Sequence, residues 1–181
     1  MNFYTSDLHF GHDHCLKSDC RPFRNAEEMD EALIAAWNAR VTDADHIYIL
    51  GDLIYKSRHD PLWYLERLSG RKHLIAGNHD SILLENAEAL SCFESVDQLS
   101  FIYDEGAKAH LVLCHYPLAE WHRMRHGALH LYGHIHSSRG ATYDIMKAVP
   151  GAYNASVTVN KYAPATLTEI MENNRLFRGI G

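Results

Sequence analysis

Side chains that bind metal ions or transfer protons follow several short apolar runs of this chain. In the turn Gly77-Asn78-His79-Asp80, an amide oxygen, an imidazole and a carboxylate stand in consecutive positions. An amide oxygen can ligate a hard cation, and a histidine held by an aspartate can transfer protons. Residues of these kinds end five apolar runs, in the order Asp7 and His9, Asp52, Asn78, His115, and His134 with His136.

This mixture of oxygen and imidazole donors is typical of sites for divalent ions such as manganese, iron or zinc. The seven side chains are too many for one ordinary ion, but two ions that share one bridging aspartate would use all of them. Two neighbouring ions can stabilise the attacking and the leaving oxygen of an in-line displacement at phosphorus. The side chains therefore predict a dinuclear centre suited to phosphoester chemistry.

Short strands must position these side chains. Apolar runs predict strands at residues 2–6, 46–50, 74–76, 109–114 and 129–132, with further strand character at 96–103, 141–145 and 153–159. Helices are expected after Asn25, after Asp60, over residues 81–90 and after Pro164. In α/β sheets, functional sites lie beyond the carboxyl ends of the strands, so the ligand-bearing ends should meet at one place.

The spacing within two ligand pairs suggests how they reach the ions. Asp7 and His9 are two residues apart, as are His134 and His136. If strand geometry continues past the apolar run, residues two apart share one face, and both side chains can approach the same ion or adjacent ions. In three of the five runs a glycine directly precedes the first ligand, which indicates a sharp turn at the end of the strand.

The composition limits the size and the partners of the protein. With 181 residues, of which 46% are hydrophobic, residues 1–181 are expected to form one domain with a sizeable core. A net charge of −6 argues against a general nucleic-acid binder, which needs a strongly basic face. It does not oppose a small phosphoester or a nucleotide as substrate, because metal ions supply positive charge locally.

The cysteines and the N-terminal residues predict a cytoplasmic protein. The cysteines do not form a Cys-x-x-Cys pair, so a zinc ribbon or a redox motif is not expected, and Cys114 reads as a small core residue. The N-terminal residues lack the features of a signal peptide, and the sequence has no stretch long enough to cross a bilayer. Reduced thiols and no membrane association are therefore expected.

The ordered set Asp7-x-His9, Gly51-Asp52, Gly77-Asn78-His79-Asp80, His115 and Gly133-His134-x-His136 resembles the calcineurin-like metallophosphoesterases. The resemblance extends over residues 7–136, and every motif is intact. The Arg21-Pro22-Phe23 loop and residues 154–164 also look like those of small bacterial and phage members. The resemblance implies an α/β fold, a four-layer α/β/β/α sandwich of the metallo-dependent phosphatase type.

The resemblance also implies a role for each motif residue. One ion would be held by Asp7, His9 and His136, and the other by Asn78, His115 and His134, with Asp52 as the bridge. His79 would be the catalytic histidine, supported by Asp80. Two divalent ions per chain are implied, with manganese as the first choice and iron, zinc, nickel or magnesium as alternatives.

The implied reaction is hydrolysis of a phosphate ester by a metal-bound hydroxide, with His79 as the general acid. A phosphodiester is slightly favoured over a phosphomonoester, and nucleic acid is considered only as a substrate. The alternative is a non-catalytic binding scaffold with the same fold; such members tend to lose the catalytic histidine, which this chain retains. The sequence leaves the oligomeric state open.

Two basic segments allow more than one interpretation. Arg21 and Arg24 could reach over the site and bind a phosphate. The simpler reading, which we favour, is a solvated loop in which Phe23 is a hydrophobic peg. His122-Arg123-Met124-Arg125-His126 could line a substrate groove, although a solvated loop or helix face is the simpler reading.

Overall fold

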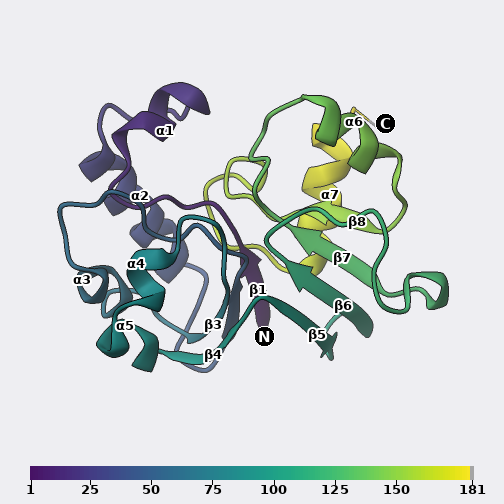
Figure 1. The fold of residues 1–181 in the computed structure, drawn as a ribbon, viewed down its shortest axis with the longest axis horizontal. Helices are drawn as coiled ribbons and strands as arrows, with labels where there is room; N and C mark the ends of the chain where they lie inside the picture. The colour runs from purple at the N-terminus through teal and green to yellow at the C-terminus, as the bar shows by residue number, and fades with distance from the viewer. Residues whose placement is uncertain (180–181) are drawn as a thin grey trace.

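Two four-stranded sheets lie at the centre of residues 1–179, the part of the chain that this computed structural model describes (Figure 1). The first sheet is parallel, in the order β1 (Asn2–Thr5), β2 (His46–Ile49), β3 (Arg71–Ile75) and β4 (Phe93–Asp97). The second has the order β5 (Leu99–Asp104), β6 (Ala109–Cys114), β7 (Leu129–Tyr132) and β8 (Ala152–Asn154). In it β5 runs antiparallel to β6, β6 parallel to β7, and β7 parallel to β8.

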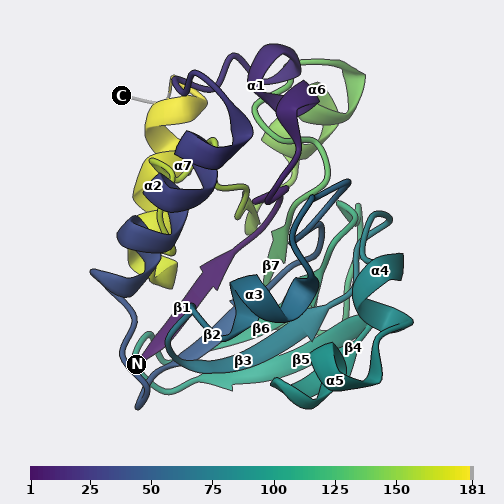
Figure 2. The same ribbon diagram turned by 90° about the vertical axis from the view of Figure 1, so that its left-hand side faces the viewer.

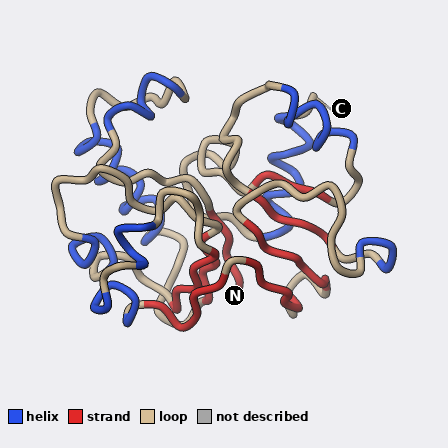
Figure 3. The backbone as a smooth tube through the Cα atoms, viewed as in Figure 1, coloured by secondary structure: helices blue, strands red, loops and turns tan. Residues whose placement is uncertain are grey.

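Helices flank the two sheets on their outer sides, as Figure 3 shows. On the side of the first sheet lie α1 (Asp13–Ser18), α2 (Ala26–Asn38), α3 (Pro61–Leu65), α4 (Ser81–Leu84) and α5 (Ala87–Ser91). Seen from that side in Figure 2, α3 and α5 lie in front of the parallel strands. On the side of the second sheet lies α6 (Ala141–Ala148). The helix α7 (Leu167–Phe177) contacts β8 and β1, and its Leu167 and Ile170 pack in the apolar cluster that also contains Leu111 and Leu131.

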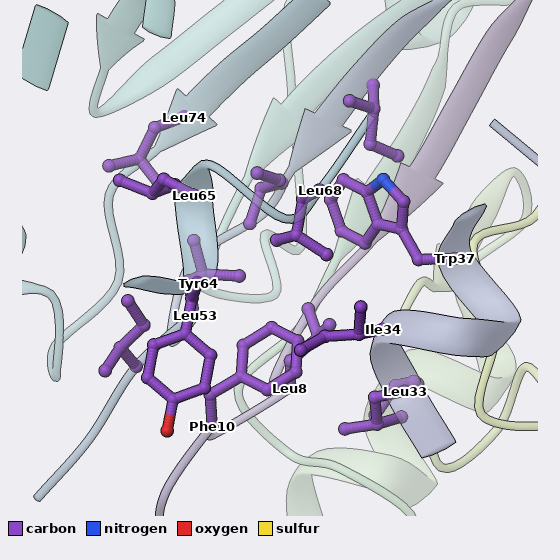
Figure 4. Close-up of a cluster of buried hydrophobic side chains, with 14 of the residues drawn as sticks. Leu8, Phe10, Leu33, Ile34, Trp37, Leu53, Tyr64, Leu65, Leu68 and Leu74 are labelled. Carbon is purple, nitrogen blue, oxygen red and sulfur yellow. The ribbon is translucent and has the colours of Figure 1, made fainter. Parts of the chain in front are cut away.

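The first layer of core packs the helices of the N-terminal half against the outer face of the first sheet (Figure 4). Leu33 and Trp37 of α2 are buried there with Leu74 of β3. The ring of Phe10 stacks on that of Tyr64, with centroids 4.9 Å apart. Burial of large apolar side chains of this kind, about 1.5–3 kcal/mol each, holds the helices to the sheet.

Two further apolar layers complete the stack. Between the sheets, Leu50 and Ile75 pack with Leu111 and Leu131. On the outer face of the second sheet, Val112, Trp121 and Tyr132 pack with Met146 of α6 and with Ala152. Three apolar layers separate helix, sheet, sheet and helix, so the predicted four-layer α/β/β/α sandwich is confirmed.

The start signals of the helices act as predicted. The Asn25 side chain accepts a hydrogen bond from the Glu28 N–H at the start of α2. Asp60 caps α3 in the same way, with Pro61 at the first helical position. Each cap satisfies a backbone donor that the helix itself leaves unpaired.

The single helix predicted over residues 81–90 is wrong. The segment forms α4 and α5, two short helices separated at Asn86. The Asn86 side chain accepts hydrogen bonds from the N–H groups of Glu88 and Ala89 and so begins a new helix. Asparagine competes with the helical backbone in this way, which favours caps over helix interiors.

The strands predicted at 141–145 and 153–159 need correction. Residues 141–148 form α6, in which Tyr143 and Met146 are buried while Ile145 is 58% exposed, a helical rather than an alternating pattern. β8 ends at Asn154, after which the chain turns. The strand character at 96–103 belongs to two strands in different sheets, because the chain passes from β4 to β5 at Gln98.

Two further features concern the cysteines and the lengths of the helices. All four cysteines found within residues 1–179 are free, and Cys114 is buried. In the same residues, every helix is too short or too polar to span a bilayer.

Candidate metal centre

The loops that follow β1, β2, β3, β6 and β7 meet beyond the carboxyl ends of these strands. The backbone N–H of Asp7 donates to the Gly51 carbonyl at 3.0 Å, and that of His9 donates to the Asp52 carbonyl at 3.0 Å. The N–H of His134, from the second sheet, donates to Asp7 Oδ1 at 3.0 Å. These bonds join loops that are far apart in the sequence and bring the predicted ligands to one place.

The first half of the centre contains the ligands predicted for one ion together with the predicted bridge. Asp7, His9, Asp52 and His136 each offer a ligand atom, and these atoms all lie within 4.8 Å of one another. His9 Nε2 is 3.2 Å from His136 Nε2, which in turn is 3.6 Å from Asp7 Oδ1. Asp7, His9 and Asp52 are buried, so this half is shielded from water.

The second half contains the ligands predicted for the other ion and is more open. Asn78 Oδ1 lies 3.0 Å from His115 Nε2 and 3.0 Å from His134 Nδ1. Asn78 and His134 are exposed, whereas His115 is buried. Asp52 Oδ2 is 3.5 Å from His9 Nε2 and 3.6 Å from His115 Nε2, so one carboxylate oxygen faces both halves.

Hydrogen bonds on the outer side of two imidazoles decide which nitrogen faces the centre. His115 Nδ1 lies 2.8 Å from the Leu50 carbonyl oxygen, which can only accept, so Nδ1 carries the proton. His136 Nδ1 likewise lies 2.6 Å from an Asp19 carboxylate oxygen. The His115 Nε2 lone pair then faces Asn78 Oδ1, another acceptor, at 3.0 Å. Such facing lone pairs repel unless a cation lies between them, so this donor set fits divalent metal ions.

The backbone of the ligand loops differs from the expected strand continuation. Regular strand geometry ends at Thr5 and Tyr132, before the ligands begin. The residues with positive φ include most of the ligands: Asp7 (57°), His9 (53°), Asp52 (56°), His134 (67°) and His136 (50°). Alternate left-handed residues, rather than a pleated strand, direct the paired side chains into the centre. Aspartate and histidine tolerate this conformation better than most side chains, and strain of this kind gathers at functional sites.

Two of the glycines that precede ligands are needed for close packing. A Cβ atom on Gly133 would overlap Ser6 Oγ and Asp7 Oδ2. A Cβ atom on Gly77 would overlap Asp52 Oδ1. These glycines therefore let the loops approach the carboxylates, which is a stronger requirement than the sharp turn read from the sequence.

Asp80 has different partners from those expected of a residue that supports His79. Its carboxylate is buried and accepts hydrogen bonds from the N–H groups of Gly77 at 2.7 Å, Asp52 at 2.9 Å and Leu53 at 3.0 Å. These contacts fasten the β2 loop to the β3 loop. Asp80 thus positions Asp52, the predicted bridge, and its effect on His79 is through the backbone.

His79 lies at the edge of the centre. Its backbone N–H donates to Asp52 Oδ1 at 2.8 Å, and its ring lies 4.0 Å from the Tyr55 ring and 5.5 Å from the His9 ring, between centroids. His79 also lines a cavity of about 200 Å³ together with His12 and most of the predicted ligands. The imidazole is therefore within the space that a substrate at the metal ions would enter.

Burial changes the charges that the centre can carry. Desolvation, assisted by the neighbouring His136, lowers the pKa of His9 to about 2, and desolvation also lowers the pKa of His134. Burial opposes the charged form of His136 too, but the hydrogen bond that His136 donates to the Asp19 carboxylate and the charge of Asp7 raise its pKa above the ordinary value. Desolvation raises the pKa of the Asp52 carboxyl. Neutral imidazoles have a free lone pair, as metal ligation requires.

Three residues hold the candidate ligands or their loops in position, and the sequence analysis did not predict that they would do so. Asp19 orients the His136 ring, and the Asn154 side chain donates to the His136 carbonyl at 2.7 Å. Arg21 is buried and donates to the Asp7 and Leu8 carbonyl oxygens, each at 2.7 Å, and to Asp19. Asp19 lies 117 residues from His136 in the sequence, and Asn154 lies 18 residues away, so no local pattern connects them.

The remaining basic residues lie farther from the ligands. Arg24 is exposed and pairs with Glu28 at 2.6 Å, in agreement with the solvated reading. Arg21, by contrast, is neither solvated nor directed at an open phosphate site, because its guanidinium binds the loop backbone. The ring of His122 contacts that of Phe101 on β5, at a centroid distance of 4.7 Å.

Curated proteins include relatives of this chain over most of its length. No protein-family model matches the chain. The chain is 31% identical to uncharacterized protein MJ1445 of Methanocaldococcus jannaschii over 98% of its own length and 95% of that protein. It is 30% identical to the Gene 66 protein of Mycobacterium phage L5 over 75% of this chain and 77% of the phage protein.

Solved structures show a related fold. A protein of unknown function from Aquifex aeolicus, AQ665, superposes with a TM-score of 0.72 and 25% identity, covering 95% of this chain and 98% of that one. Nuclease MPE of Pseudomonas putida superposes with a TM-score of 0.50 and 19% identity, covering 75% of this chain and 60% of the nuclease. The chain has the calcineurin-like metallophosphoesterase fold. It belongs to the family that includes the MJ1445 protein.

Proposed function

We propose that the protein is a dinuclear-metal-dependent phosphoesterase. The observation that carries this proposal is the position of Asp52, whose Oδ2 atom faces His9 Nε2 at 3.5 Å and His115 Nε2 at 3.6 Å. Asp7, His9 and His136 would hold one ion, Asn78, His115 and His134 would hold the other, and Asp52 would contact both. Manganese is the first choice because the donors mix oxygen with imidazole nitrogen.

Two bound divalent ions would lower the pKa of a water molecule and offset charge on the phosphoryl oxygens. The residues of the chain provide the geometry for this. Asp80 and the N–H of His79 hold both ends of Asp52, through its backbone N–H and its Oδ1 atom, and leave Oδ2 directed at the centre. Asp19 and the Leu50 carbonyl hold His136 and His115 with their Nε2 atoms inward.

His79 is the proposed general acid. Its ring lines the cavity at the ligands and is not needed to hold either ion. The backbone bond to Asp52 fixes the base of the side chain, and the Tyr55 ring packs against the imidazole. From this position the ring can donate a proton to the leaving oxygen of a bound ester.

A neighbouring cavity favours a substrate with two ester groups. A hollow of about 540 Å³, lined by residues that include His12, Tyr55 and Lys56, adjoins the site through His12. The Tyr55 ring and the Lys56 ammonium group lie on the side of His79, where the leaving group would be. They can bind the second organic group of a phosphodiester, including that of a nucleotide. We therefore expect the site to prefer a phosphodiester to a phosphomonoester.

A turnover assay on metal-reconstituted protein tests the function. We expect manganese-loaded protein to hydrolyse an aryl phosphodiester faster than an aryl phosphomonoester, and a chelator to abolish both activities. Asp52→Ala should lose bound metal, measured by elemental analysis, together with activity, whereas His126→Ala, a change at an exposed histidine, should lose neither. Full metal occupancy without turnover would contradict the proposal and favour the non-catalytic scaffold.

A further inference from the structure

A second cluster of metal-ligating side chains lies toward the amino end of the first sheet. His46 begins β2, His73 lies in β3 and Glu94 lies in β4, and one ligand atom from each lies within 4.8 Å of the others. The catalytic loops follow the carboxyl ends of these parallel strands, so the two clusters are at opposite ends. The chemistry of the second cluster does not depend on the proposed phosphoesterase activity.

An irregularity in strand pairing assembles this cluster. The pairing of β3 with β4 passes from Lys72 opposite Phe93 to His73 opposite Ser95, so Glu94 is an extra residue. In regular pairing, Glu94 and Ser95 would point to opposite faces of the sheet. The shift lets both reach His73: Glu94 Oε2 lies 3.9 Å from Nε2, and Ser95 Oγ lies 3.0 Å from Nδ1. Irregularities that redirect side chains in this way are common near functional sites.

The His73 ring is oriented as a metal ligand would be. With Nδ1 hydrogen-bonded to Ser95, the Nε2 atom faces His46 Nδ1 at 2.9 Å. A hydrogen bond on the other ring nitrogen is the usual support of a ligating histidine. The Tyr48 ring stacks on His73 with centroids 4.6 Å apart and planes 15° apart, which fixes the ring plane. Burial lowers the pKa of His73, so its neutral form is favoured.

The donor types and separations match those of zinc. Zinc takes imidazole nitrogen and carboxylate oxygen at roughly 2.0–2.2 Å in tetrahedral geometry, which places neighbouring ligand atoms about 3.3 Å apart. The observed separations of 2.9 Å and 3.9 Å lie on either side of this value. We propose that His46, His73 and Glu94 form an accessory site for a zinc-type transition ion that links three strands of the first sheet.

The residues around the cluster leave room for water as a fourth ligand, and they include Arg71, which competes with a cation for Glu94. His46 also lines a cavity of about 600 Å³ whose wall includes Asp104 and Glu105, so the fourth coordination position is open to water in an acidic environment. Arg71 Nε binds Glu94 Oε1 at 2.6 Å and leaves Oε2 for the ion. The positive charge of Arg71 weakens cation binding, so Arg71→Gln should bind zinc more tightly than the unaltered chain.

Zinc stoichiometry after gel filtration in metal-free buffer tests the site. Glu94→Gln should bind one zinc equivalent less than the unaltered chain and keep its phosphoesterase activity, since Glu94 is exposed and outside the catalytic loops. Ser95→Ala should weaken zinc binding about tenfold by removing the support of the His73 ring. His126→Gln is the control and should keep every zinc equivalent.

Two further measurements separate this site from the catalytic centre. In an Asp52→Ala chain, the accessory site should still retain one zinc equivalent, which added Glu94→Gln should remove. Crystals containing zinc should show an anomalous peak between His46, His73 and Glu94 at the zinc absorption edge. Equal zinc content in Glu94→Gln and the unaltered chain, with no such peak, would overturn the accessory site and leave the phosphoesterase proposal untouched.

Discussion

The two ends of the first sheet gather metal-ligating side chains by different means. At the carboxyl end, Asp7 and Asp52 come from loops with left-handed backbone conformations, and so does His134, which joins them from the second sheet. At the amino end, His46 and His73 come from paired strands, with one shift in register beside them. The first arrangement depends on contacts between distant loops, whereas the second depends on the hydrogen-bonded ladder of neighbouring strands.

Carboxylate acceptors stabilise the loop-built end. Asp80 binds the loops after β2 and β3, Asp19 binds His136, and Asp30 of α2 accepts hydrogen bonds from the Gly11 N–H and the Tyr64 hydroxyl. A loop has no ladder to satisfy its N–H groups, so side-chain acceptors must do this. Changes at these acceptors should therefore disturb the loop-built end far more than changes at the ladder-built end.

The largest effect is expected from His79→Ala at the loop-built end. Because His79 does not hold an ion in the proposed arrangement, the variant should keep its metal. It should lose on the order of 10²–10⁴ in rate on substrates with poor leaving groups, the usual contribution of a general acid. Single-turnover rates on an alkyl and an aryl phosphodiester provide the measurement. Equal rates of variant and unaltered protein on the alkyl ester would exclude His79 as the acid.

A second test compares buried and exposed carboxylates. Asp80→Ala leaves the N–H groups of Gly77, Asp52 and Leu53 without their acceptor, so the free energy of unfolding should fall by about 3 kcal/mol or more. Glu94→Ala at the other end, measured in metal-free protein, should change it by less than about 0.5 kcal/mol. Urea denaturation of both variants measures the difference. Similar losses would contradict the contrast between the two ends.

Asp19→Ala tests how the loop-built centre orients a ligand. The variant removes the acceptor that holds His136 Nδ1 at 2.6 Å. Manganese affinity, measured by titration calorimetry, should fall about 10- to 100-fold, as expected for loss of a carboxylate behind a ligating histidine. Asp13→Ala, a change at an exposed aspartate of the same segment, serves as the control. Unchanged affinity in Asp19→Ala would remove Asp19 from the positioning residues.

The last expected effect is a gradual pH dependence from Asp30. Burial raises the pKa of its carboxyl from 3.8 to about 6 in the folded chain. Between these values the folded state binds more protons than the unfolded state, so the free energy of unfolding should fall as the pH rises through this window. The loss, about 3 kcal/mol, should be complete above the folded pKa. In Asp30→Asn, the free energy of unfolding from urea denaturation should not show this fall between the two pKa values. Identical pH profiles of the variant and the unaltered protein would refute the role of Asp30.

The ligand residues were accessible to prediction because their types and order are local properties of the chain. Strands at 109–114 and 129–132 were predicted with the bounds that the structure has, since each run is apolar apart from one histidine. The helix at 141–148 was missed because apolar residues at 141, 143 and 145 imitate the alternation of a strand. Burial of Met146 against the second sheet, a tertiary contact, decides the helix.

By itself the sequence determined which side chains could form the candidate centre, because residue types and their order after strands need no long-range information. Which nitrogen of His115 or His136 faces inward is decided by groups far away, the Leu50 carbonyl and Asp19. The left-handed backbone at the ligands is likewise imposed by contacts between the two sheets. The physical reason is that hydrogen-bond donors in a loop have no fixed partner until the whole chain is folded around them.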